Sequence, residues 1–94
     1  MQEKDNNIGM VLKCLRVIND MTISDTAGEL KLSKAYVGEL EKGTRNPSIS
    51  TLQKYSDYFN IPSSVLLYFN EEASKNRMSY QKLLLIILKK IVKM

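Results

Sequence analysis

The chain has 94 residues, of which 44% are hydrophobic and 26% charged, so it is expected to fold as one small globular domain with a thin core. It contains no histidine and a single cysteine, Cys14, which excludes a histidine-based catalytic triad, a histidine metal site and an intramolecular disulfide. The net charge of +4 and the isoelectric point of about 9.2 are compatible with nucleic-acid binding.

The excess positive charge lies in the C-terminal part of the chain. Residues 1–70 hold eight basic and eight acidic residues, whereas residues 71–94 hold six basic residues and only two acidic ones. The first 70 residues are therefore neutral, and composition alone gives weak support for DNA binding. A lone thiol, the lack of a secretory signal pattern and apolar runs of at most six residues favour a cytoplasmic protein with no membrane span.

Apolar residues recur at helical spacing from Ile8 to Ile18, which predicts the first helix. A second apolar stripe on the same segment passes through Met10, Cys14 and Val17. This helix is therefore apolar on two faces. The second face is either part of an ordinary small-protein core or the surface on which another element packs.

Capping residues delimit two short helices in the next part of the chain. The segment 22–25, Thr-Ile-Ser-Asp, has the form of a capping box and predicts a helix that ends at Leu30. Ser33 is the expected N-cap of the following helix, which Gly43 ends as its C-cap. Lys31 lies in the turn between them, where a left-handed backbone would cost a lysine about 1 kcal/mol.

Three more helices are expected after a turn at residues 44–47. One begins at Pro47-Ser48, the next is a short apolar helix that Ser63 caps and that ends at Phe69, and the last covers residues 80–94. No segment alternates as a strand does. The sequence therefore predicts an all-α fold with five short helices and a sixth appended at the C-terminus.

The two helices over 23–30 and 33–42 have the lengths and the tight turn of a helix-turn-helix. Ala27 is a small residue where the two helices must approach closely, and Val37 is a branched apolar residue that can pack beneath the second helix. Residues 8–69 resemble the Cro/repressor-type helix-turn-helix family of bacterial and phage regulators. The matching residues are Ile8, Gly9, Leu12, Leu15, Arg16, Met21, Thr22, Ala27, Leu30, Ser33, Val37, Leu40, Glu41, Lys42, Gly43, Asn46, Pro47, Ser48, Leu52, Phe59, Asn60, Ile61 and Pro62.

The resemblance implies a five-helix, repressor-like domain over residues 7–69. Residues 70–94 are interpreted as a connector and a dimerisation helix because the last helix is strongly apolar. It also implies a partly buried ion pair between Arg16 and Glu41, which would tie the first helix to the end of the recognition helix. Both residues are read as structural, and the alternative is a solvated surface pair.

The resemblance further implies that the second helix of the pair enters the major groove of double-stranded DNA with its N-terminal residues. The residues that match the family's base-reading positions are Lys34, Ala35, Gly38 and Glu39. Lys34 can donate to guanine or to a phosphate, Ala35 can touch a thymine methyl group and Glu39 can accept from cytosine N4. Gly38 costs the helix roughly 1 kcal/mol relative to alanine, and it either lets DNA come close or is simply tolerated.

Contacts to the DNA backbone are expected from the first turn of the first helix of the pair, from the loop after the recognition helix and from the next helix N-terminus. The residues chosen are Ser24, Tyr36, Thr44, Arg45, Asn46 and Ser50. Three residues depart from the family pattern: Ile23 replaces a glutamine that contacts phosphate, Thr26 a core leucine, and Lys31 a turn glycine. Two alternatives therefore stay open: the chain binds DNA only weakly, or it uses the scaffold for a different task. In either case Lys34 and Arg45 would be ordinary solvated side chains.

The C-terminal helix is apolar nearly all round between Leu83 and Leu88, so another surface must cover it. The favoured interpretation is a homodimer, in which this helix exchanges with that of a partner. The residues expected at the dimer interface are Leu66, Phe69, Leu83, Leu84, Ile87, Leu88 and Ile91. The alternatives are a helix that folds back to complete its own core and a basic amphipathic helix on a membrane surface, for which the lysines are too scattered.

These features predict a homodimeric, sequence-specific DNA-binding transcriptional regulator, a repressor or autoregulator, that reads an inverted-repeat operator. Its size resembles that of phage or mobile-element repressors, restriction-modification controllers and antitoxins. The alternative is a protein-interaction module on the same scaffold, whose partner is a toxin or an anti-repressor and which binds DNA weakly or not at all. Nothing in the sequence supports an enzyme, a metal site or a cofactor.

Overall fold

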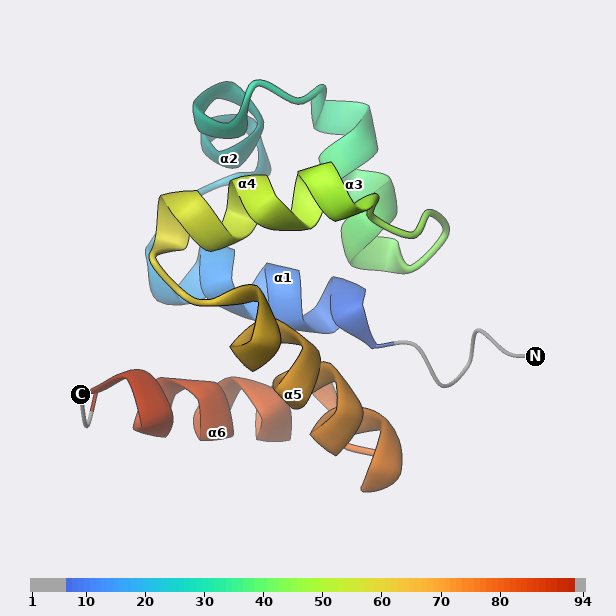
Figure 1. The fold of residues 1–94 in the computed structure, drawn as a ribbon, viewed down its shortest axis with the longest axis vertical. Helices are drawn as coiled ribbons and strands as arrows, with labels where there is room; N and C mark the ends of the chain where they lie inside the picture. The colour runs from blue at the N-terminus through green and yellow to red at the C-terminus, as the bar shows by residue number, and fades with distance from the viewer. Residues whose placement is uncertain (1–6, 93–94) are drawn as a thin grey trace.

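The computed structural model describes residues 7–92, with side chains to residue 91, and Figure 1 shows their arrangement. The described residues are all-helical and contain no strand, which confirms the predicted fold class. The helices are α1 (Ile8–Ile18), α2 (Ile23–Leu30), α3 (Lys34–Lys42), α4 (Ile49–Phe59), α5 (Ser63–Lys75) and α6 (Tyr80–Val92). None of these helices is long and apolar enough to cross a membrane.

The N-terminal ends of α2, α3 and α4 are fixed by side-chain caps. The Thr22 hydroxyl accepts from the Asp25 backbone N–H at 2.9 Å, and the Asp25 carboxylate accepts from the Thr22 N–H at 3.0 Å, so the predicted capping box is present. Ser33 caps α3 and Gly43 ends it with a φ of +83°. Lys31 adopts the expected left-handed conformation, with φ at +60°.

Helix α5 differs from the prediction at both ends. Ser63 is its first residue and not its cap; Pro62 is the N-cap, and its side chain makes no capping hydrogen bond. The helix continues to Lys75, because the buried stripe of Leu66 and Phe69 is extended by Ala73, one more turn along the same face. The predicted domain boundary after residue 69 therefore falls inside a helix.

The core is built around α1, which packs against α3, α5 and α6. Its N-terminal turn lies so close to α3 that a Cβ on Gly9 would overlap the carbonyl oxygen of Leu40, which explains why glycine stands there. Cys14, on the second apolar stripe of α1, is fully buried. Both apolar faces of α1 are thus used within one chain.

Helix α6 covers α1 and also contacts α5. Figure 1 shows α6 at the end of the molecule opposite α2. The Lys13 ammonium group lies 4.6 Å from the ring centre of Tyr80, at the start of α6. In this arrangement α6 completes the core of its own chain, which is one of the alternatives that the sequence left open for the C-terminal helix.

This packing changes what the predicted dimer interface can contain. Of its seven residues, four lie in the core of the single chain with 3% or less of their surface exposed: Leu66, Phe69, Leu83 and Ile87. These four cannot touch a partner unless α6 leaves its place. Leu84 and Ile91 are half-buried, and Leu88 is exposed.

Candidate nucleic-acid interface

Helices α2 and α3 cross as the predicted helix-turn-helix pair. Ala27 and Val37, the small residue and the branched residue of the pattern, are both buried. Thr26, which departs from the family pattern, is also buried, and its hydroxyl has no hydrogen-bond partner among the described residues. A buried hydroxyl without a partner destabilises the packing of α2, so this departure has a physical cost.

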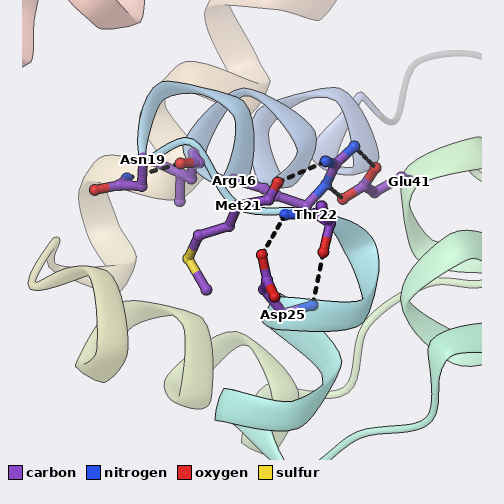
Figure 2. A network of polar contacts seen from close by, with 7 residues as sticks. Arg16, Asn19, Met21, Thr22, Asp25 and Glu41 are labelled. Carbon is purple, nitrogen blue, oxygen red and sulfur yellow. Dashed lines mark hydrogen bonds and ion pairs between the residues drawn. The ribbon is translucent and has the colours of Figure 1, made fainter.

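Arg16 and Glu41 form the ion pair that the resemblance implies, as Figure 2 shows. Arg16 Nε donates to one carboxylate oxygen at 2.7 Å and Nη2 to the other at 2.9 Å. Nη1 donates to the carbonyl oxygen of Met21 at 2.9 Å, so the guanidinium also holds the turn between α1 and α2. The hydrogen bonds to Glu41 raise the pKa of Arg16, and the two side chains are only 13% and 6% exposed, so this is not a solvated surface pair.

The N-terminal half of α3 presents three predicted base-reading residues to solvent. Lys34 and Ala35, the first two residues after the N-cap Ser33, are exposed. Gly38 faces open space, since a Cβ there would meet none of the described atoms within 4 Å. This strip of α3 is small and unobstructed, with one positive charge at its start.

Glu39, the fourth predicted base-reading residue, is tied to the loop that follows α3. Its backbone carbonyl accepts from the Thr44 N–H at 3.1 Å, the Thr44 hydroxyl at 3.2 Å and the Arg45 N–H at 3.4 Å. Its carboxylate lies 3.6 Å from Arg45 Nη1. Two residues predicted to contact the DNA backbone, Thr44 and Arg45, are thereby brought beside a base-reading position.

Tyr36 joins this loop to α4. Its hydroxyl shares a hydrogen bond of 3.1 Å with the Thr51 hydroxyl, and the Arg45 guanidinium lies 5.2 Å from its ring centre. Ser48, the N-cap of α4, donates to the same Thr51 hydroxyl at 3.1 Å. The Tyr36 hydroxyl therefore has a partner within the chain.

The sequence model of the helix-turn-helix family matches residues 12–66, more than half of the chain, and its span includes α2, α3 and the α3–α4 loop. The chain belongs to the helix-turn-helix family. Over 56 residues, 60% of this chain, it is 36% identical to the HTH-type transcriptional regulator DdrOP3 of Deinococcus deserti. The aligned part is 43% of the length of that regulator.

The other predicted backbone contacts of this helix-turn-helix chain lie at helix N-termini and in the loop. Ser24 is exposed in the first turn of α2, and Asn46 is exposed in the loop. Ser50 is exposed in the first turn of α4, with its hydroxyl 3.2 Å from that of Ser48. The first turns of α2 and α4 thus both carry a hydroxyl beside helix N–H groups, an arrangement that suits phosphate binding.

Sequence reasoning missed Ile49, which is 87% exposed at the first position of α4. It lies between the exposed loop of the helix-turn-helix and Ser50. No signal in the sequence marks this exposure, because Ile49 precedes Leu52 by three residues and helical spacing would place it on the core face of α4 with Tyr55 and Phe59.

Proposed function

We propose that this helix-turn-helix chain is a sequence-specific DNA-binding transcriptional regulator, a repressor or autoregulator. The observation that carries the proposal is the unobstructed strip of Lys34, Ala35 and Gly38 on α3, next to a loop whose Arg45 is exposed. A small, exposed helix face can enter the major groove, and a cation beside it can bind the adjoining phosphate. The 36% identity to a transcriptional regulator supports the same function.

Each residue of the strip is assigned a role from the chemistry of its side chain. Lys34 donates to guanine O6 and N7, Ala35 contacts a thymine methyl group, and Gly38 allows the DNA to approach the backbone of α3. Ser24 and Ser50 donate to phosphates on either side of the groove from the first turns of α2 and α4. The Arg16–Glu41 pair acts indirectly, because it fixes the end of α3 to α1 and so sets the angle of the recognition helix.

The regulator is proposed to act as a homodimer on an inverted-repeat operator. Leu88 is exposed, Leu84 and Ile91 are half-buried, and Leu85 on the same helix is 58% exposed, so apolar side chains remain on the outer face of α6, beside the exposed Lys82 and Lys89. Burying such a face against a second copy would remove it from water and place two recognition helices in one complex. The dimer contact is therefore assigned to this outer face of α6.

DNA binding is tested by selecting sequences from a random duplex library with the full chain and measuring their affinity by fluorescence anisotropy. Lys34→Ala should change the selected base at one position and weaken binding by about 1–3 kcal/mol. Lys54→Ala, which removes an exposed lysine from α4, is the matched control and should leave the selected sequence unchanged. The absence of any complex at micromolar protein and low salt would contradict the proposal.

The dimer is tested by sedimentation equilibrium of the full chain and of the variant Leu85→Lys/Leu88→Lys. Both side chains are exposed, so the variant should fold as the parent does while its dimer dissociates. A variant that remains dimeric would move the interface to the exposed side chains of α5, namely Val65, Leu67 and Tyr68.

The second candidate is a protein-interaction module that binds a toxin or an anti-repressor. The observation in its favour is the buried, unpartnered hydroxyl of Thr26 in α2, together with Ile23 in place of a phosphate-binding glutamine. Failure to bind DNA combined with stable folding would favour this candidate over the regulator.

A further inference from the structure

Two oppositely charged residues assigned to DNA contacts pair with each other in the protein. Glu39 Oε1 lies 3.6 Å from Arg45 Nη1, and both side chains are about half exposed, at 46% and 60%. An exposed pair of this kind shifts an equilibrium by less than about fivefold, so it does not hold the fold together. Its location, between the recognition helix and the following loop, suits a role in DNA contact instead.

The backbone holds Glu39 and Arg45 close to each other. The carbonyl oxygen of Glu39 accepts the N–H groups of Thr44 and Arg45, so the loop bearing Arg45 is anchored on Glu39 itself. The Thr44 hydroxyl makes a third bond to the same oxygen. The backbone of Arg45 is therefore tied to α3, and its side chain lies within reach of the Glu39 carboxylate.

The ring of Tyr36 supports the guanidinium from the other side. Arg45 lies 5.2 Å from the ring centre, and the Tyr36 hydroxyl is tied to Thr51, which is buried in α4. With Nη1 directed toward Glu39, the remaining guanidinium N–H groups can meet an anion, since arginine carries five donors in a planar fork. The Arg45 guanidinium is thus held in place while some of its N–H groups remain able to donate to an anion.

A carboxylate on the DNA-facing side of α3 weakens DNA binding unless a cation neutralises it, because DNA carries a negative charge on every phosphate. We propose that Arg45 is a positioning residue for Glu39. It bridges the Glu39 carboxylate and a DNA phosphate, cancels the repulsion between them and holds the carboxylate at the edge of the base that it reads. This inference rests on the proposed function, since it requires α3 to face DNA.

The bridge predicts that Arg45 and Glu39 are energetically coupled on DNA. A double-mutant cycle measures the affinity of the full chain, Arg45→Ala, Glu39→Gln and the double variant for a duplex of unrelated sequence at low salt. Arg45→Ala should weaken binding at least about fivefold more in the parent chain than in the Glu39→Gln background. In the parent background the substitution leaves the Glu39 carboxylate without a cation, whereas in the Glu39→Gln background there is no carboxylate to neutralise. Arg45→Lys should restore most of the affinity for the unrelated sequence, since it returns the charge, but not the base preference that depends on the planar fork.

Lys54→Ala is the control for charge alone, and its effect should be the same with either residue at position 39. Thermal unfolding of all variants checks that each is folded. Equal losses for Arg45→Ala in the two backgrounds, within about twofold, would overturn the bridge while leaving DNA binding intact. Failure of the parent chain to bind any duplex would overturn both the bridge and the proposed function, so the two failures are distinguishable.

Discussion

At the scale of single residues, the Arg16–Glu41 pair is the contact that most clearly determines local geometry. Both oxygens of Glu41 and three nitrogens of Arg16 are used, and one of those nitrogens holds the carbonyl of Met21. The pair thus joins the end of the recognition helix to the turn that precedes α2. Removing one partner leaves a poorly solvated charge, which costs more than the pair itself contributes.

Arg16→Ala is therefore expected to lower the free energy of unfolding by about 3–5 kcal/mol, as measured by urea denaturation. The double variant Arg16→Met/Glu41→Leu leaves no buried charge and should lose much less than Arg16→Ala alone. If Arg16→Ala lost under about 1 kcal/mol, the pair would have to be solvated in solution.

At the scale of elements, the placement of α6 determines which of its leucines matter. Leu83 is fully buried against α1, whereas Leu85, two residues on, is 58% exposed. Burial raises the pKa of the Tyr80 phenol in α6, and Cys14 of α1 adds to that shift. Burial raises the pKa of Cys14 itself to about 12, so the thiol stays protonated and unreactive at neutral pH while α6 is in place.

Leu83→Ala should lower the free energy of unfolding by about 2–5 kcal/mol, because it leaves a cavity between α1 and α6. It should also speed the reaction of Cys14 with a thiol reagent under native conditions. Leu85→Ala, the same substitution on the exposed face, is the control; at protein concentrations where the chain is monomeric it should change stability by less than about 0.5 kcal/mol. Equal effects of the two substitutions would mean that α6 does not pack on α1 in solution.

The sequence predicted those elements whose ends are marked by capping chemistry. Helices α2, α3 and α4 start at Thr22, Ser33 and Ser48, each with a side chain that bonds the backbone three residues on. Helix α5 has no such mark at its C-terminal end, and the one apolar residue that continues its buried face, Ala73, is too small to stand out in a polar segment. Its length was therefore underestimated.

The position of α6 could not be read from the sequence because more than one surface could cover it, and the homodimer was the favoured interpretation. The second apolar stripe of α1 and a second copy of the chain both offer apolar contact area. In the structure α6 packs on α1, after a longer α5 and a reversal at Arg77, whose φ is +49°. Likewise, the family resemblance and the position in the loop assigned Glu39 and Arg45 to DNA separately, but only the fold shows that they contact each other.

At the scale of the whole molecule, charge and recognition are separated. The residues up to 70 are neutral as a group, and Lys82, Lys89 and Lys90 of the basic C-terminal part belong to α6, which Figure 1 places at the end opposite α2. If the proposed function holds, the lysines of α6 lie away from the DNA. The electrostatic part of binding then depends on a few residues near α3, chiefly Lys34 and Arg45.

Salt titration tests this separation. Arg45→Ala should reduce the slope of log affinity against log salt by about one, the value for a single phosphate contact. Lys89→Ala/Lys90→Ala removes two exposed cations from α6 and should leave that slope unchanged. A larger change in slope for the α6 variant than for Arg45→Ala would place the α6 lysines on DNA.

The packing of α6 on α1 also bears on how the chain is made. These two helices lie far apart in the sequence and share one core. Because α1 is translated before α6, the face of α1 that α6 covers stays exposed until α6 has also been made. The complete core therefore cannot form before both helices are present.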